Sequence, residues 1–236
     1  MTHARNFPAT LLPLALLLAT GCFKLSRETP PLQQFVLSGP VAANANPMPD
    51  GLAVGFRRID VASYLAVPWL VVRRGSNEIM ASEYHRWGED LGEAINRVVA
   101  ANLAGRPPVR NTDIAPWAPR ARHQYLVQLH VARFEGVTDT SAFAPRQADG
   151  RVHLRATWDI IRPLDGLVLI RGSSEDRSGT WRVDNYATLA SGLDSALVRL
   201  ARDIGSCLSR FRNDSTPPVS CSTMSNSDTA RLDPPN

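Results

Sequence analysis

The first 22 residues constrain this chain more than any other stretch, because they contain the parts of an export signal. Arg5 precedes an apolar run from Leu11 to Leu18, and small residues follow at positions 19–21. This order predicts a secretory signal peptide, which is removed from the mature protein. The apolar run is about half as long as a membrane-spanning helix, so we do not expect it to remain in a bilayer. The mature chain is therefore expected to fold outside the cytoplasm.

A cysteine follows the small residues directly and makes the signal more specific. The segment ending at Cys22 resembles a bacterial lipobox, although Ala19 stands where leucine is more common. A cysteine thiolate is a strong nucleophile, which suits alkylation by diacylglycerol. The resemblance implies cleavage before Cys22, a covalent diacylglycerol and an N-acyl chain such as palmitate on Cys22. Phe23 in the next position implies sorting to the outer membrane. The alternative is an ordinary signal peptide with a chance cysteine.

The mature chain is expected to contain one domain between two polar segments. Removal of residues 1–21 leaves 215 residues, which is enough for a single hydrophobic core. Residues 22–31 are polar, contain two prolines and are interpreted as a tether. Residues 32–212 carry the apolar patterns of a folded domain. Residues 213–236 are rich in Ser, Thr, Pro, Asn and Asp, and are predicted to be disordered.

The charge of the chain does not predict a nucleic-acid partner. The formal net charge is only +4, and arginine supplies 25 of the 26 basic residues without forming long runs. An exported protein also has little access to nucleic acid. We interpret the arginines first as a coding bias and second as an anion-binding surface.

Two cysteines remain after lipidation, Cys207 and Cys221. An even number of cysteines in an oxidising compartment is typical of a disulfide. A bridge would close a short loop and hold the C-terminal tail against the last helix. Two unpaired thiols remain the alternative, because Cys221 lies in the segment predicted to be disordered.

Apolar periodicity predicts the order strands, helix, strands, helix. The first helix is predicted to be capped by Ser82, to begin at Glu83 and to extend to Leu103; the second covers Tyr186–Phe211. The predicted strands are 32–37, 52–61, 69–73, 78–81, 109–114, 124–134, 152–160 and 167–174. The short links between strands predict a single α+β domain, with two long helices packed on a mostly antiparallel sheet.

Enzymatic motifs are absent from the sequence, so no catalytic residue and no metal ligand is predicted. The histidines do not have the spacing of HExxH, and the chain lacks a CxxC motif, a nucleophile elbow and a phosphate-binding loop. A weak alternative is a two-histidine site formed by His130 and His153 on neighbouring strands.

The segment 52–103 resembles the ABC-type transport auxiliary lipoproteins of the PqiC type. The motifs that carry the resemblance are Tyr64-Leu65, Val71-Val72-Arg73 and Arg86-Trp87, in that order. With the lipobox, the early strand and the last helix, the resemblance covers residues 32–212. The chain departs from the family pattern at Ala66 and Val67, where a charged pair is usual, and at Gly88, where alanine is common.

The resemblance implies a non-enzymatic protein that is anchored on the periplasmic face of the outer membrane. It implies docking to a periplasm-spanning MCE-domain protein, a role in lipid transport or membrane integrity, and assembly into a homo-oligomeric ring. The alternative is a stand-alone lipid-binding or envelope-assembly lipoprotein.

Four residues of the family-like segment are candidates for the partner interface: Tyr64, Trp69, Arg73 and Arg86. Tyr64 and Trp69 flank an irregular bend, and exposed aromatic residues often anchor interfaces. Simple packing for the aromatic residues, and solvation for the arginines, are the alternatives. Trp87 is interpreted as a core residue at the start of the first helix.

Overall fold

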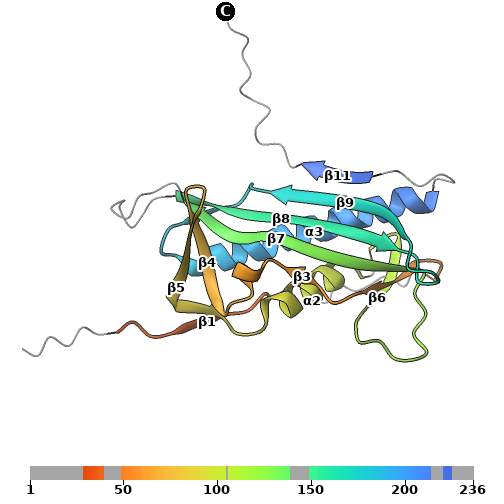
Figure 1. Cartoon of the computed structure of the whole chain (residues 1–236), viewed down its shortest axis with the longest axis horizontal. Coiled ribbons are helices and arrows are strands. Elements are labelled where there is room, and N and C mark those ends of the chain that lie inside the picture. The colour runs from red at the N-terminus through yellow and green to blue at the C-terminus, as the bar shows by residue number, and fades with distance from the viewer. Residues whose placement is uncertain (1–28, 40–48, 105, 139–148, 214–219, 225–236) are drawn as a thin grey trace, which may run out of the picture. The chain divides into compact units, whose positions relative to one another are not determined.

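The computed structural model describes residues 29–39, 49–104, 106–138, 149–213 and 220–224, with the backbone alone for 211–213 and 222–224. The signal peptide, Cys22 and most of the tether lie outside the described residues. The described residues from Leu32 onward form one compact unit (Figure 1).

The described chain contains eleven strands, two α-helices and one short 3₁₀ helix. The helices are η1 (Ser63–Leu65), α2 (Leu91–Leu103) and α3 (Tyr186–Asn213). The first six strands are β1 (Gln33–Phe35), β2 (Leu52–Phe56), β3 (Asp60–Val61), β4 (Trp69–Arg74), β5 (Glu78–Trp87) and β6 (Val109–Ile114). The other five are β7 (Tyr125–Thr138), β8 (Asp149–Ile161), β9 (Val168–Asp176), β10 (Thr180–Arg182) and β11 (Ser220–Met224).

All described strands belong to one sheet, and that sheet is mixed. Its main path runs β1-β5-β4-β7-β8-β9-β11, while β10 pairs with the start of β8. The hairpins β4–β5, β7–β8 and β8–β9 are antiparallel, as the short links predicted. The pairs β1–β5, β4–β7 and β9–β11 are parallel. The single α+β domain is therefore confirmed, and the prediction of a mostly antiparallel sheet is wrong.

The long strand β7 explains why parallel pairs are so numerous. Its edge away from β8 pairs successively with β2, β3 and β4, and all three run parallel to it. These three strands come before α2 in the sequence, whereas β7 comes after it. A long connection that contains a helix allows strands to align in parallel, which a tight hairpin cannot do.

One face of the β7–β8–β9 region contributes to the hydrophobic core. Alternate β8 residues (Leu154, Ala156, Trp158) are buried there with the apolar stripe of α3. A Cβ on Gly136 would lie 2.8 Å from Trp181 and 3.0 Å from Leu189, so glycine allows a close approach at that point. α2 contacts α3 and β6, and α3 also contacts β7 to β10. The prediction that both helices pack on the sheet therefore holds only in part.

The first helix begins later than predicted. Residues 82–87 extend β5, because 85–87 pair with β1, and α2 starts at Leu91 with Asp90 as its cap. The Asp90 carboxylate accepts a hydrogen bond from the Glu93 amide at 2.9 Å. Trp87 is a core residue, as predicted, but it is the last residue of β5. Pairing with two neighbouring strands outweighs the helical spacing of this segment.

Two further strands were not predicted. β10 is a short strand with Trp181 buried, and β11 lies inside the tail that was expected to be disordered. The predicted strand 52–61 is divided into β2 and β3, while 109–114 is a strand with the predicted limits. Among the described helices, none is both long and apolar enough to cross a membrane.

Candidate functional site

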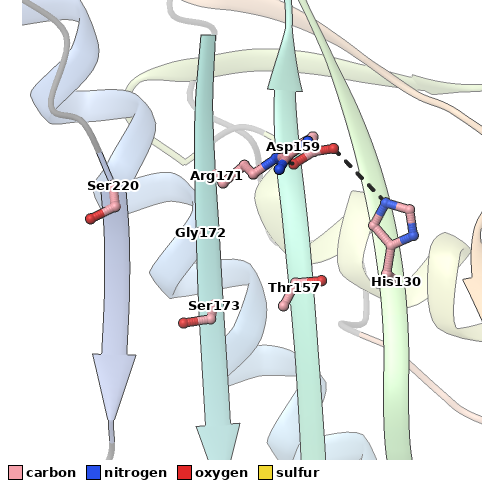
Figure 2. A pocket seen from close by; sticks show the side chains of 7 residues that line it. All are labelled: His130, Thr157, Asp159, Arg171, Gly172, Ser173 and Ser220. Carbon is pink, nitrogen blue, oxygen red and sulfur yellow. Dashed lines mark ion pairs between the residues drawn. The ribbon is translucent and has the colours of Figure 1, made fainter. Parts of the chain in front are cut away.

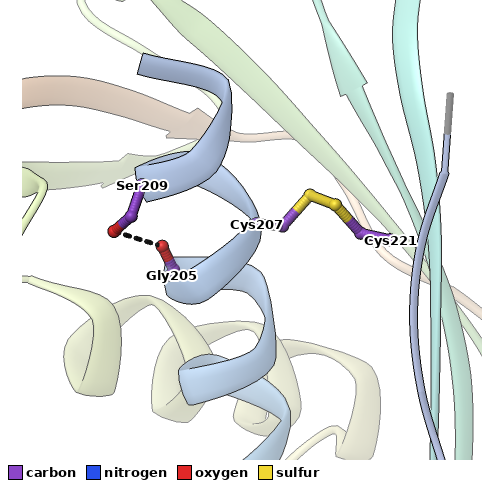
Figure 3. Close-up of a disulfide and its surroundings, with 4 residues drawn as sticks. All are labelled: Gly205, Cys207, Ser209 and Cys221. Atoms are coloured by element: carbon purple, nitrogen blue, oxygen red, sulfur yellow. Dashed lines mark hydrogen bonds between the residues drawn. A yellow bond between two sulfur atoms is a disulfide. The ribbon is translucent and has the colours of Figure 1, made fainter. Parts of the chain in front are cut away.

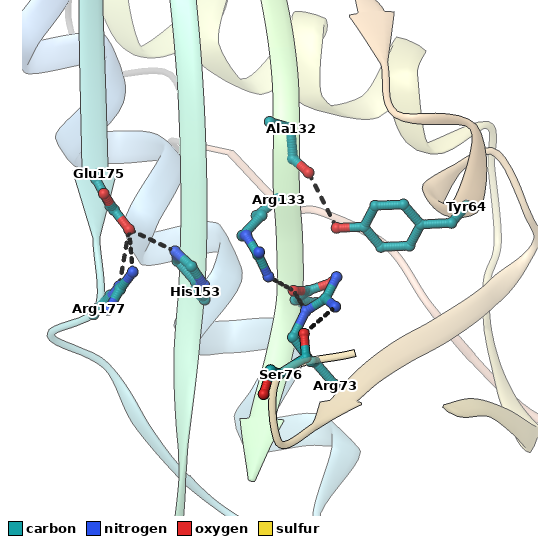
Figure 4. Close-up of polar contacts among 9 residues, drawn as sticks. Tyr64, Arg73, Ser76, Ala132, Arg133, His153, Glu175 and Arg177 are labelled. Carbon is teal, nitrogen blue, oxygen red and sulfur yellow. Dashed lines mark hydrogen bonds and ion pairs between the residues drawn. The ribbon is translucent and has the colours of Figure 1, made fainter. Parts of the chain in front are cut away.

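Tyr64, in the family-like segment, lies where the paired strands β3 and β7 both become irregular. Between β3 and β4 the chain leaves the sheet through η1, and β7 has a register shift between Val131 and Arg133. Ala132 lies at that irregularity, and its carbonyl oxygen accepts a hydrogen bond from the Tyr64 hydroxyl at 3.1 Å (Figure 4). An irregularity in a ladder leaves a backbone group without its regular partner, and Tyr64 satisfies one here.

Next to Tyr64, a buried carboxylate lies between two arginines. Glu135 on β7 has no solvent exposure, and its Oε1 lies 2.5 Å from Arg73 Nε and 3.1 Å from an Arg133 nitrogen. The Arg73 guanidinium lies 5.5 Å from the centre of the Tyr64 ring. Burial, and then the hydrogen bond with Glu135, raises the pKa of Tyr64 to about 12. The same carboxylate raises the pKa of Arg73.

Trp69 and Arg86 form a second pair of an arginine with an aromatic ring. They face each other across β4 and β5, and the guanidinium lies 6.0 Å from the ring centre. Both residues are half-buried. The four predicted interface residues are thus two separate pairs, and Arg73 and Tyr64 are held by internal contacts.

The structure also contains a groove that the sequence analysis did not identify. Residues 61, 65–68 and 87–92 line it, and its volume is about 350 Å³. Leu65, Trp87 and Leu91 form its buried apolar wall, and the rim carries Glu89 and Asp90. The motifs Tyr64-Leu65 and Arg86-Trp87 each contribute one residue to the lining, Leu65 and Trp87. These motifs were the signal in the sequence that could have indicated the groove.

The lining of this groove includes the three positions at which the chain departs from the family pattern. Ala66 and Val67 lie on one side, and Gly88 lies on the other. Ala66 and Gly88 are exposed. Small apolar residues here in place of a charged pair make the groove more apolar than the family pattern implies.

A second hollow lies on the face of the sheet that points away from the core. It has a volume of about 530 Å³ and crosses β7, β8, β9 and β11 (Figure 2). His130 on β7 lies 3.4 Å from an Asp60 oxygen and 4.0 Å from an Asp159 oxygen. Arg171 lies 3.2 Å from the other Asp159 oxygen. The other lining residues are Thr157, Gly172, Ser173 and Ser220.

The two-histidine site is not formed. His130 is opposite Thr157, whereas His153 lies four positions before Thr157 on β8 and is opposite Glu135. The imidazole Nε2 of His153 lies 2.9 Å from Glu175, which also pairs with Arg177 (Figure 4). Burial lowers the pKa of His153 despite the hydrogen bond to Glu175. In the described part of the chain, no group of three His, Cys, Asp or Glu side chains could hold a metal ion.

Cys207 on α3 and Cys221 on β11 are joined by a disulfide (Figure 3). Both residues are buried in the core. The bond connects the helix to an edge strand, because β9 is the only described strand that pairs with β11.

Comparison with known proteins places this geometry in context. The family model described as "ABC-type transport auxiliary lipoprotein component" matches residues 35–205. A crystal structure from Xanthomonas campestris, of the DUF330 family, is 12% identical with a TM-score of 0.59; the alignment covers 77% of this chain and 98% of that one. A crystal structure of an uncharacterized protein is 16% identical with a TM-score of 0.56, covering 75% and 98%. These two structures share the fold. No curated protein matches the sequence.

Proposed function

The chain belongs to the ABC-type transport auxiliary lipoprotein family, as its motifs predicted, and on this premise we propose that it is the outer-membrane docking subunit of an MCE/ABC-type transport system. In this role it moves no substrate by itself and catalyses no reaction. It binds a periplasm-spanning MCE-domain protein and thereby helps to transfer lipids or other hydrophobic molecules and to maintain membrane integrity. The family match over residues 35–205 is the observation that carries the proposal.

The anchor is the diacylglycerol and N-acyl chain on Cys22. The lipobox-like sequence supports lipidation, and Phe23 supports retention in the outer membrane. Several acyl chains, each contributing about 0.8 kcal/mol per buried methylene, would make membrane attachment effectively permanent. The folded unit from Leu32 onward would then face the periplasm.

We place the partner-docking site at the groove lined by residues 61, 65–68 and 87–92. An interface anchor typically enters an apolar pocket with a polar rim, and this groove has both features. Two of the three motifs that identify the family, Tyr64-Leu65 and Arg86-Trp87, contribute residues to its lining. Tyr64 and Arg73 act as its support, since the hydrogen bond to Ala132 and the ion pair with Glu135 hold the wall in place.

The test is recovery of the partner from cross-linked cells, with a tag at the C-terminal tail. Ala66→Arg places a charged side chain at the groove, and Ala101→Arg makes the same change on the exposed side of α2. We expect the wild type and Ala101→Arg to recover an MCE-domain protein. Ala66→Arg should recover at least tenfold less of it, which corresponds to a loss of about 1.4 kcal/mol of binding free energy. Equal recovery with both variants would exclude the groove as the docking site. Absence of any MCE-domain protein from the wild type would refute the transport role.

The same groove supports the alternative of a stand-alone lipid carrier, because its wall is apolar. In that case native mass spectrometry of the soluble domain would detect a bound lipid, and Ala66→Arg would abolish it. Lipid without a protein partner would favour the carrier over the docking subunit.

A ring of identical subunits is part of the proposal. The described sheet ends at β1 and β11, and each has one side without a strand partner. Unpaired strand edges are sites at which another chain can add. Light scattering of the purified protein would measure a multiple of the subunit mass if the ring forms.

A further inference from the structure

The face of β7, β8 and β9 that points away from the core carries many arginines. Figures 2 and 4 look onto this face, with the helices on the other side of the strands. Side chains alternate along β8, so that 152, 154, 156 and 158 are buried while 151, 155 and 157 are exposed. The arginines of this face are Arg73, Arg133, Arg151, Arg155, Arg171 and Arg177. We call this surface the arginine face.

The carboxylates of the arginine face are largely covered, whereas the arginines reach solvent. The side chains of Glu135, Asp159 and Glu175 are 0%, 19% and 24% exposed. Those of Arg171 and Arg177 are 78% and 54% exposed. Two well-exposed acids lie on this face among the described residues: Asp60, at the rim beside His130, and Asp149, at the start of β8. The solvent-exposed charge is therefore predominantly positive.

Two of the arginines have no anionic partner among the described residues. Among the described residues, neither Arg151 nor Arg155 forms a hydrogen bond or an ion pair, and both are exposed. Arg155 lies directly opposite Arg133 on β7. Like charges opposite each other destabilise a sheet, and a bound anion would remove that cost. Glu175, the opposite neighbour of Arg155 on β9, is already paired with His153 and Arg177.

We propose that the arginine face lies on the anionic phospholipid headgroups of the membrane that carries the protein. Guanidinium groups bind phosphate oxygens through two parallel hydrogen bonds, and each basic residue near an anionic membrane adds to binding. The hollow beside Arg171 adds hydroxyls of Thr157 and Ser220 as further hydrogen-bond donors for a headgroup. The interaction orients the domain and leaves the docking groove free for its partner.

A membrane fits this face better than an acidic protein does. The centre of a protein interface is depleted of charge and rich in aromatic and apolar side chains. On the arginine face, the exposed positions of β8 are Asp149, Arg151, Arg155 and Thr157, none of which is apolar. The proposed lipid anchor also keeps the domain close to a membrane surface, because the ten residues from Cys22 to Pro31 span at most about 35 Å. The inference depends on the proposed function only for this anchor.

The test is vesicle binding by the mature chain with Cys22→Ser, which lacks the acyl chains but keeps every other residue. The probes are vesicles of phosphatidylcholine alone and vesicles that also contain phosphatidylglycerol. We expect sedimentation with the anionic vesicles only, and release at high salt, because salt screens surface charges. The double substitution Arg151→Gln/Arg155→Gln should weaken binding on the order of thirtyfold, at about fivefold for each arginine. Arg202→Gln/Arg210→Gln on the exposed side of α3 removes the same charge and should change binding little.

Four results would overturn the inference, provided that thermal unfolding shows both double variants to be folded. The first is equal binding to the two kinds of vesicle, and the second is an equal effect of the two double variants. The third is stabilisation by inorganic phosphate without vesicle binding, which would mean that the face takes a free anion. The fourth concerns the Arg151→Gln/Arg155→Gln variant. If this variant no longer recovers an acidic protein in the pull-down but binds vesicles as the wild type does, the face is a protein interface. The groove variant Ala66→Arg should bind vesicles normally, so failure of the docking proposal is separate from failure of this one.

Discussion

At the residue scale, the ion-paired carboxylate of Glu135 has no contact with solvent and is held by Arg73 and Arg133. Glu135→Gln removes the negative charge but keeps the shape, and leaves two arginines without their partner. Loss of one member of a buried ion pair costs several kcal/mol, so we expect the free energy of unfolding to fall by about 3 kcal/mol. Urea denaturation measures this change.

The matched control is Glu78→Gln, at an exposed carboxylate that pairs with Arg74 on the β4–β5 hairpin. Its effect should stay within about 0.5 kcal/mol, as for most surface substitutions. If both variants lose the same stability, Glu135 is not the centre of a buried cluster.

His153 predicts a dependence of stability on acidity. Burial lowers the pKa of His153 in the folded protein, whereas in the unfolded chain its pKa is about 6.5. As the pH falls below that value, the unfolded state binds a proton before the folded state does, so this residue makes stability fall. His153→Gln should therefore lose less stability between neutral and mildly acidic pH than the wild type does.

The control for this pH series is His130→Gln, because the side chain of His130 is 41% exposed. Denaturation of the three proteins over the pH series gives the comparison. A wild type and a His153→Gln variant with parallel pH profiles would contradict the assignment.

At the element scale, the disulfide between Cys207 and Cys221 holds β11 on the edge of β9. Reduction should lower stability by up to about 3 kcal/mol, the chain-entropy value for a loop of about 15 residues. It should also speed amide exchange in residues 171–175, which pair with β11. Denaturation and hydrogen exchange with and without reductant measure both effects.

The double variant Cys207→Ser/Cys221→Ser provides the control, because reductant cannot act on it. It should behave as the reduced wild type in both measurements. An oxidised wild type that resembles this variant would show that the bond does not hold the edge strand.

At the scale of the whole molecule, the acyl anchor should determine where the protein is found. Cys22→Ser should move the protein from the membrane fraction to the soluble fraction once high salt has removed electrostatic binding. Cys207→Ser/Cys221→Ser should stay in the membrane fraction, because it keeps the lipidated cysteine. Retention of Cys22→Ser on membranes at high salt would show that Cys22 is not the main anchor.

The sequence alone determined those features that depend on local chemistry. The order of charged, apolar and small residues predicts export, and the alternation along 124–134 and 152–160 predicts strands that the structure contains as β7 and β8. Turn residues at 75–77 mark the β4–β5 hairpin, in which Gly75 has a positive φ of 57°. Short motifs identified the family, because they need only neighbouring residues to be recognised.

Only the tertiary structure decided which strands pair and which face of each is open. Apolar alternation tells that one side of a strand is buried, but it does not specify the partner strand or its direction. For that reason the parallel pairs of β7, and the extension of β5 to Trp87, were missed. The groove lined by residues 61, 65–68 and 87–92 and the arginine face both combine residues far apart in the sequence. Such surfaces exist only after long-range pairing has placed those residues side by side.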